Sequence, residues 1–156
     1  MKKIKLYLDT SVLNFVLTDQ PMLANRKEST INLLEEIKAG NYDAYISEQV
    51  LVEINKAEET KTKDLMDLIG ALPLESLPLS EDIEELADKY VEEEIIPLKY
   101  RDDALHIAIA SANNLDVIVS WNFNHMVKLK TKQGVIAVNS LLGYKSIEII
   151  TPEEVV

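Results

Sequence analysis

Acidic and amide side chains stand where strands of this sequence are predicted to end, or on the helices that follow them. Asp9 and Asn122 each come directly after a predicted strand. Glu53 borders the apolar face of a predicted helix, and Asp103 lies at the start of another. The crevice of an open parallel sheet lies at the carboxyl ends of its strands, so these residues can converge there. Three carboxylates without a nearby Arg repel one another, and a divalent cation such as Mg²⁺ or Mn²⁺ is the natural compensation.

The three carboxylates also have ordinary structural explanations. Asp9 fits a helix N-cap as well as it fits a ligand. A lone Glu such as Glu53 is by default a solvated residue. The helix dipole favours a carboxylate at Asp103, and its neighbour Asp102 fits a peripheral charge. Taken singly, none of these residues decides for a metal site.

The polar neighbours leave similar alternatives open. His106 shares a helix face with Asp103, and such a histidine is more often a hydrogen-bonded core residue than a metal ligand. It could instead orient Asp103 or a backbone group. Asn122 and Asn124 lie in the segment Ser120–His125, which also fits a turn rich in asparagine. Trp121 and Phe123 flank Asn122, and we expect them to fix this loop by packing rather than to stack on RNA bases.

The elements that position these residues alternate between strand and helix. We predict strands at residues 3–8, 42–46, 117–119, 135–138 and 147–150, and a strand-like link with two prolines at residues 71–78. We predict helices at residues 10–17, 26–39, 61–70 and 101–114, and two more that begin after the N-caps Ser47 and Ser80. The helix at 101–114 is apolar around most of its circumference and should be buried. This alternation indicates one α/β domain, residues 1–156, around a mainly parallel sheet.

Composition excludes several classes of protein. The 156 residues include no cysteine, so there is no disulfide framework, thiol nucleophile or cysteine-ligated zinc. A hydrophobic content of 47% is too high for a disordered chain. No segment is long and apolar enough for a membrane span, so we expect a soluble cytoplasmic protein with no membrane association. The net charge of −11 argues against non-specific nucleic-acid binding.

The order of the motifs resembles that of PIN-domain proteins, a family of metal-dependent ribonucleases that includes the VapC-like toxins of toxin–antitoxin pairs. The likeness rests on Leu8-Asp9-Thr10-Ser11, on the helix carrying Glu53, on Asp103-Ala104-Leu105-His106-Ile107-Ala108, and on the Ser120–His125 loop. It covers most of the chain. The resemblance implies a three-layer α/β/α sandwich and hydrolysis of RNA phosphodiester bonds.

The resemblance also implies the parts of the site. Asp9, Glu53 and Asp103 would be the catalytic carboxylates and would hold one or two Mg²⁺ or Mn²⁺ ions, directly or through water. Asn122 falls on a fourth catalytic position that is commonly Asp in the family. Thr10 and Ser11 would support the site by hydrogen-bonding a ligand carboxylate or a substrate phosphate, and His106 and Asn124 are further supporting residues. The implied partners are RNA, an antitoxin whose C-terminal segment covers the site, and a second copy of the chain.

The negative charge is unevenly distributed, which reopens the question of RNA. Residues 81–94 contain eight acidic side chains and one lysine, as expected for a solvated helix face. Residues 95–145 contain six basic side chains against three acidic ones. Lys128, Lys130 and Lys132 closely follow the Asn122 loop, and we expect them to form a basic rim that contacts RNA.

Two other functions remain open at this stage. A PIN-like binding protein or scaffold with impaired catalysis is supported by Asn122, since an amide supplies no negative charge. Another metal-dependent phosphohydrolase, acting on a small phosphorylated substrate, is disfavoured because the chain has no Gly-rich phosphate loop.

Overall fold

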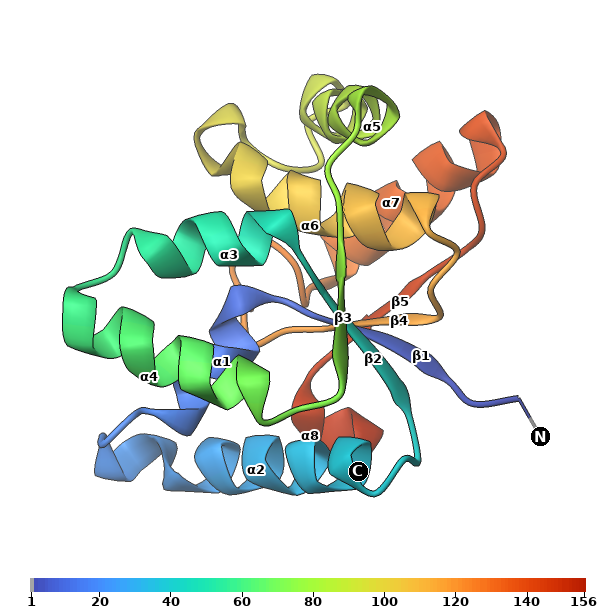
Figure 1. The fold of residues 1–156 in the computed structure, drawn as a ribbon. Coiled ribbons are helices and arrows are strands. Elements are labelled where there is room, and N and C mark those ends of the chain that lie inside the picture. Colours follow the sequence, from blue (N-terminus) through green and yellow to red (C-terminus); the bar gives the residue numbers. More distant parts are fainter. Residues whose placement is uncertain (1) are drawn as a thin grey trace.

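Five parallel strands form the central sheet, in the order β3–β2–β1–β4–β5 (Figure 1). The computed structural model describes residues 2–156. Its strands are β1 (Lys5–Leu8), β2 (Asp43–Ser47), β3 (Leu74–Leu77), β4 (Val117–Val119) and β5 (Glu148–Ile150). Strand β1 pairs with β2 on one side and with β4 on the other, so it lies at the centre of the sheet.

Helices cover both faces of this sheet and give the expected three-layer α/β/α sandwich. The α-helices are α1 (Thr10–Val16), α2 (Ala24–Lys38), α3 (Glu48–Asn55), α4 (Glu59–Gly70), α5 (Glu81–Glu92), α6 (Arg101–Ala112), α7 (Leu129–Leu142) and α8 (Pro152–Val155). Short 3₁₀ helices, η1 (Pro21–Leu23) and η2 (Leu98–Tyr100), precede α2 and α6. In Figure 1, α2, α4 and α8 lie below the sheet, and α5, α6 and α7 lie above it. None of the helices in residues 2–156 is both long and apolar enough to cross a membrane.

Burial on both faces explains the apolar character of the inner strands. Leu6, Tyr7 and Leu8 of β1 are fully buried, as are Ile118 and Val119 of β4. A strand covered by helices on both sides shows no polar alternation, because each side chain meets a packed layer. Helix α6 is buried on every side from Ala104 to Ser111, as its composition predicts. It therefore holds Asp103 and His106 rigidly against the sheet.

The segment 135–138, predicted as a strand, is instead part of helix α7. Its β-branched residues led to the wrong prediction, since Val135, Ile136 and Val138 favour strands by intrinsic propensity. The buried side chains of this helix are Thr131, Val135, Val138 and Asn139, which are spaced as one helix face. Tertiary packing of that face outweighs the local preference. The last parallel strand is β5, near the chain end.

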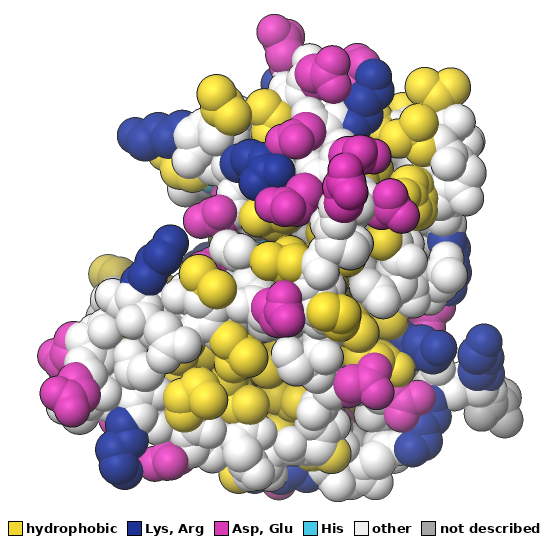
Figure 2. All heavy atoms as spheres, turned by 45° about the horizontal axis from the view of Figure 1, so that its top comes forward, with side chains coloured by type: hydrophobic (Ala, Val, Ile, Leu, Met, Phe, Trp, Pro, Cys, Tyr) yellow, Lys and Arg dark blue, Asp and Glu magenta, His cyan; other side chains and the backbone are white. Residues whose placement is uncertain are grey.

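The helix-capping predictions are confirmed. The Ser47 hydroxyl accepts a hydrogen bond from the backbone N–H of Val50 at the start of α3, and Ser80 accepts one from Ile83 at the start of α5. All eight acidic residues of segment 81–94 are exposed. Figure 2 shows acidic side chains gathered over this upper part of the molecule. This acidity is therefore a solvated face, and it does not describe the site at the strand ends.

Candidate active site

Asp9, Glu53, Asp103 and Asn122 line one cavity of about 310 Å³ at the carboxyl ends of the central strands. Asp9 directly follows β1, and Glu53 lies on α3, which directly follows β2. Asp103 is in the first turn of α6, and Asn122 lies in the loop after β4. The remaining lining residues are Thr10, Ser11, Asn14 and His106. Since β1 lies between β2 and β4, the cavity occupies the point where connections diverge to the two sides of the sheet, a usual ligand position in such folds.

Asp9 is nearly inaccessible, with 4% of its surface exposed. Its Oδ1 accepts hydrogen bonds from the Ser11 hydroxyl and from the backbone N–H of Val12, so Asp9 is also the N-cap of α1. Its Oδ2 accepts a hydrogen bond from Ser120, the first residue after β4. Burial raises the pKa of Asp9, although His106 and the hydroxyls of Ser11 and Ser120 counteract part of this rise. These hydrogen bonds hold the Asp9 carboxylate in one orientation, but they do not fully offset the cost of burying its negative charge.

Glu53 ends a buried chain of hydrogen bonds. Its Oε2 lies 2.8 Å from His106 Nε2, and His106 Nδ1 lies 2.6 Å from the Tyr7 hydroxyl. The Tyr7 hydroxyl in turn lies 2.7 Å from Ser47 Oγ. When the imidazole is neutral, Ser47 donates to Tyr7, Tyr7 donates to Nδ1, and Nε2–H donates to Glu53, so every hydrogen in the chain has an acceptor. When the imidazole is protonated, Nδ1–H donates to Tyr7, which donates to Ser47.

The same contacts set the titration of Glu53 and His106. Burial opposes ionisation of Glu53, but hydrogen bonds from His106, Thr10 and Gln49 outweigh it and lower the Glu53 pKa. Burial would lower the pKa of His106, but the Glu53 carboxylate, with help from Asp9 and Asp103, raises it overall. Glu53 is therefore an ionised carboxylate whose two oxygens are both engaged, Oε1 by Thr10 and Oε2 by Gln49 and His106.

Asp103 is half-buried beside Asp9. Burial is the largest cause that raises its pKa, and the charge of Asp9 adds to it, while Asn122 and His106 lower it. The Asn122 carbonyl oxygen accepts a hydrogen bond from the backbone N–H of His125 at 3.0 Å. Asn122 thus fixes its own loop through its oxygen and compensates Asp103 through its amide.

The loop after β4 is held by packing of Trp121, as predicted, whereas Phe123, of which the same was expected, is 43% exposed. The Trp121 side chain is 5% exposed, its Nε1–H donates to Thr30 on α2, and its ring stacks on Phe15 at 5.2 Å between centroids. Its buried position excludes a role in stacking on RNA bases. Packing of Trp121 therefore fixes the loop that carries Asn122.

Four residues predicted for the site do not line this cavity. Asn124 is exposed in the loop after β4. Lys128 and Lys130 are exposed and Lys132 is half-buried, where α7 begins. Their role as a basic rim stays a prediction.

Several residues contribute to the site in ways that their sequence pattern does not predict. Tyr7 in the middle of an apolar strand resembles an ordinary core residue. Ser47 and Ser120 had a recognisable signal, because each lies at the end of a strand next to the expected crevice. Gln49 precedes Glu53 by one helical turn, a spacing that predicts contact.

The donor types in this cavity suit Mg²⁺ or Mn²⁺, which prefer oxygen ligands. The lining residues include three carboxylates and neither Lys nor Arg. In the part of the chain that the structure describes, however, no three His, Asp or Glu side chains are placed to hold one ion together. Both oxygens of Glu53 are engaged by Thr10, Gln49 and His106. The set thus fits a divalent cation in chemistry and charge, without a formed three-residue ligand cluster.

Comparison with solved structures identifies the fold. A chain of the VapBC2 complex from Rickettsia felis, bound to a DNA fragment from its promoter, matches with a TM-score of 0.59 and 18% identity, over 95% of this chain and 98% of that one. VapC20 from Mycobacterium tuberculosis, a toxin that cleaves the sarcin–ricin loop, matches with a TM-score of 0.57 and 12% identity, over 91% and 98%. No family model matches the sequence, and no curated protein matches it either.

Proposed function

Since the chain has the VapC-like PIN-domain fold, we propose that it is a Mg²⁺- or Mn²⁺-dependent endoribonuclease. The observation that carries this proposal is that Asp9, Glu53 and Asp103 line one cavity. Asp9 follows β1, Glu53 lies on the helix after β2, and Asp103 lies in the first turn of α6. Three carboxylates lining one cavity without a basic residue suit a cation-dependent reaction on a phosphodiester.

The chain's own residues would orient the carboxylates. Asp9, Asp103 and Glu53 would hold the divalent cation, directly or through water. When bound, the cation would supply activation of water and stabilisation of negative charge on the phosphoryl group. Ser11 and Ser120 keep the Asp9 oxygens in place. Thr10 does the same for Glu53, with His106 on its other oxygen.

RNA is the proposed substrate, and an antitoxin is the proposed partner. VapC20 is described as a toxin that cleaves the sarcin–ricin loop, and this supports RNA as the substrate class. The VapBC2 complex is bound to promoter DNA, which supports a partner of the antitoxin type. Lys128, Lys130 and Lys132 would contact the RNA backbone. The exposed Leu129, Ile136 and Leu141 of α7 would support a homodimer.

Parallel assays with single-stranded RNA and with a generic phosphomonoester as substrates test this proposal. We expect RNA cleavage with Mn²⁺ present and none with EDTA, and no hydrolysis of the phosphomonoester. Hydrolysis of the phosphomonoester alone would instead support the other phosphohydrolase considered above. RNA cleavage that is equal in Mn²⁺ and in EDTA would contradict the metal dependence.

A binding protein with impaired catalysis is the second candidate. It is favoured by Asn122, whose carbonyl oxygen is engaged by the His125 backbone and whose amide carries no charge. Glu53, whose oxygens are both engaged, favours it as well. Calorimetry with Mn²⁺ at neutral pH separates the candidates, because heat of binding is expected for the enzyme and none for the scaffold.

A further inference from the structure

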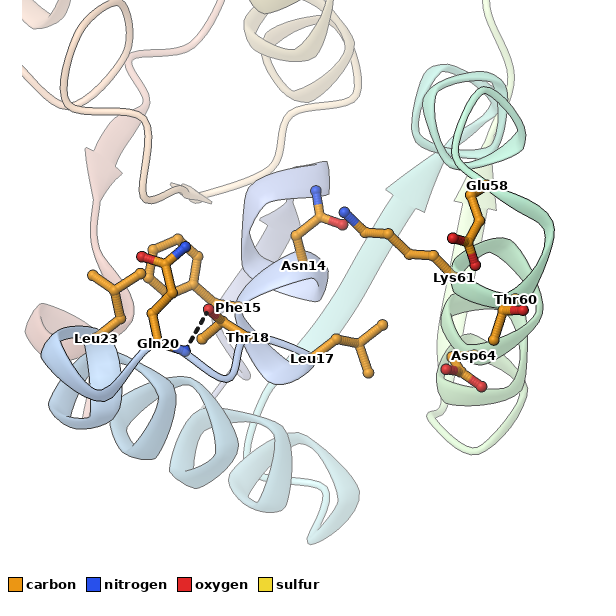
Figure 3. Close-up of a pocket in the computed structure, with 10 residues that line it drawn as sticks. All are labelled: Asn14, Phe15, Leu17, Thr18, Gln20, Leu23, Glu58, Thr60, Lys61 and Asp64. Atoms are coloured by element: carbon orange, nitrogen blue, oxygen red, sulfur yellow. Dashed lines mark hydrogen bonds between the residues drawn. The ribbon is translucent and has the colours of Figure 1, made fainter.

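A second, larger cavity of about 490 Å³ adjoins the acidic one. It lies between α1 with the loop that follows it and helix α4, and Figure 3 shows the side chains around it. Asn14 lines both cavities, so they meet at this side chain. The volume is within the range of about 300–1,000 Å³ that is usual for ligand pockets. A molecule bound at the acidic cavity can therefore extend past Asn14 into this second cavity.

Asn14 presents an unused hydrogen-bond acceptor at the junction. Its Oδ1 is the one buried side-chain oxygen or nitrogen in residues 2–156 that has no hydrogen-bond partner. A buried acceptor without a partner is costly, by about 1–3 kcal/mol, and is uncommon in native proteins. A ligand that donates a hydrogen bond here would remove this cost.

Lys61 places a positive charge next to this acceptor. Its side chain extends from α4 across the cavity toward Asn14 (Figure 3). Lys61 is exposed and takes part in none of the ion pairs found in the described part of the chain. Lys63, two residues along the same helix, pairs with Asp67 at 3.2 Å. The ammonium of Lys61 is thus available to an anionic group between the two cavities.

The rest of the lining suits a neutral group that donates hydrogen bonds. Phe15, Leu17 and Leu23 supply apolar surface, and Glu58 and Asp64 supply acceptor oxygens on α4 and the residue before it. A nucleoside combines an apolar ring with amino and hydroxyl donors. A phosphate fits only at the Lys61 end, because the two carboxylates repel it elsewhere. A cationic protein side chain would suit the acceptors but would be repelled by Lys61.

We propose that this second cavity binds the nucleotide adjacent to the phosphodiester in the acidic cavity. Its phosphate contacts Lys61, and a donor group of its sugar or base reaches Asn14 Oδ1. This subsite rests on the proposed ribonuclease function, because it extends the same substrate. It makes Lys61 and Asn14 substrate-binding residues, which neither the motifs nor the charge distribution indicates.

Titration with a mononucleotide tests the subsite without catalysis or metal. The probes are adenosine 5′-monophosphate and cytidine 5′-monophosphate, and the readout is the NMR signal of the Asn14 side-chain amide. We expect at least one of the two to shift this signal at millimolar concentration. Lys61→Ala should weaken this binding by about fivefold, since a charged phosphate contact at an exposed site is lost. Lys63→Ala is the matched control and should bind as the wild type does.

Nucleosides without phosphate separate the two contacts. The nucleoside of the mononucleotide that shifts the signal should still shift the Asn14 side-chain amide signal. Its affinity should be the same for the wild type and for Lys61→Ala. No shift of Asn14 with either mononucleotide would overturn the subsite, and so would equal weakening by Lys61→Ala and Lys63→Ala. A shift with arginine amide but not with the mononucleotides would assign the cavity to a protein partner instead.

Failure of the subsite and failure of the ribonuclease proposal give different results. A mononucleotide that binds at Asn14 in a protein that does not cleave RNA would leave the subsite in place and contradict the ribonuclease. RNA cleavage without mononucleotide binding at Asn14 would support the ribonuclease and contradict the subsite. Where cleavage is found, Lys61→Ala should raise KM for RNA by a similar factor with little change in kcat, because it removes a binding contact remote from the reacting phosphate.

Discussion

Replacing Tyr7 with phenylalanine removes one hydroxyl from the middle of the chain that joins Ser47 to Glu53. The ring stays in place in a fully buried position, so packing is preserved. The hydroxyl lies 2.6 Å from His106 Nδ1 and 2.7 Å from Ser47 Oγ. The variant leaves Nδ1 without this partner, and Ser47 keeps only the hydrogen bond from the backbone N–H of Val50. Each buried polar group left unpaired costs about 1–3 kcal/mol, so Tyr7→Phe should lower the free energy of unfolding by about 3 kcal/mol.

The effect on the site separates a positioning role from simple stabilisation. Without the hydroxyl the His106 ring can turn, and Glu53 loses one of its two donors at Oε2, while Gln49 remains as the other. Loss of such an outer contact typically lowers metal affinity or activity by about 10- to 100-fold. Because Tyr7 acts through His106, we expect Mn²⁺ affinity measured by calorimetry to fall by about tenfold, at the lower end of that range.

Tyr90→Phe is the matched control for this experiment. Tyr90 is also fully buried, and its hydroxyl bonds Asn139 at 2.5 Å and Ser111 at 3.3 Å, away from the acidic cavity. It should lose a comparable amount of stability and keep its Mn²⁺ affinity. If both variants bind Mn²⁺ equally well, Tyr7 only stabilises the fold and the positioning argument is wrong.

Three further predictions concern stability in the absence of metal. Burial and a like charge raise the pKa of Asp103, so its ionised form is unfavourable in the folded protein. Asp103→Asn should therefore raise the free energy of unfolding in EDTA at pH 7 by about 1 kcal/mol, as replacement of an unfavourable functional residue commonly does. A lower free energy of unfolding by urea titration would contradict this. The pKa of His106 is raised in the folded protein, so its contribution to stability is present below about pH 6.5, the unfolded value. That contribution is lost as the pH rises through the folded pKa. The free energy of unfolding, measured by urea titration across this pH window, should therefore decline less in His106→Gln than in the wild type. An equal decline in the two proteins would exclude His106 as the source. Gly134→Ala should lower the free energy of unfolding by about 1–3 kcal/mol, since the new Cβ would lie 2.6 Å from Ile95 Cγ1. Gly70→Ala should not destabilise the protein, because a Cβ there has no atom within 4 Å. Thermal unfolding compares the two variants, and equal melting temperatures would refute the clash.

The sequence predicts the sheet and the meeting of Asp9, Glu53 and Asp103 because both follow from periodicity and from strand ends. Asp9 is noticeable because it interrupts an apolar stretch at the point where β1 ends. The prediction fails at Val135–Val138, where strand propensity is overruled by packing of one face of α7. It also fails at Tyr7, because a tyrosine inside a strand buried on both faces has the pattern of a core residue.

Other features depend on contacts that no pattern encodes. The engagement of Glu53 by His106 joins residues 53 positions apart. The unpaired oxygen of Asn14 and the reach of Lys61 from α4 depend on how α1 and α4 are placed across the cavity. Periodicity identifies the buried face of each helix, but it does not determine the rotamer that a polar side chain adopts beside a cavity.

Cleavage of single-stranded RNA by the neighbouring variants Asp103→Asn and Asp102→Asn tests the ribonuclease most directly. Both remove one negative charge from the first turn of α6, but only Asp103 lines the acidic cavity, while Asp102 is exposed. With Mn²⁺ present, Asp102→Asn should cleave as the wild type does and Asp103→Asn should not, with both variants folded by circular dichroism. Equal cleavage by the two variants would contradict a catalytic site at Asp9, Glu53 and Asp103.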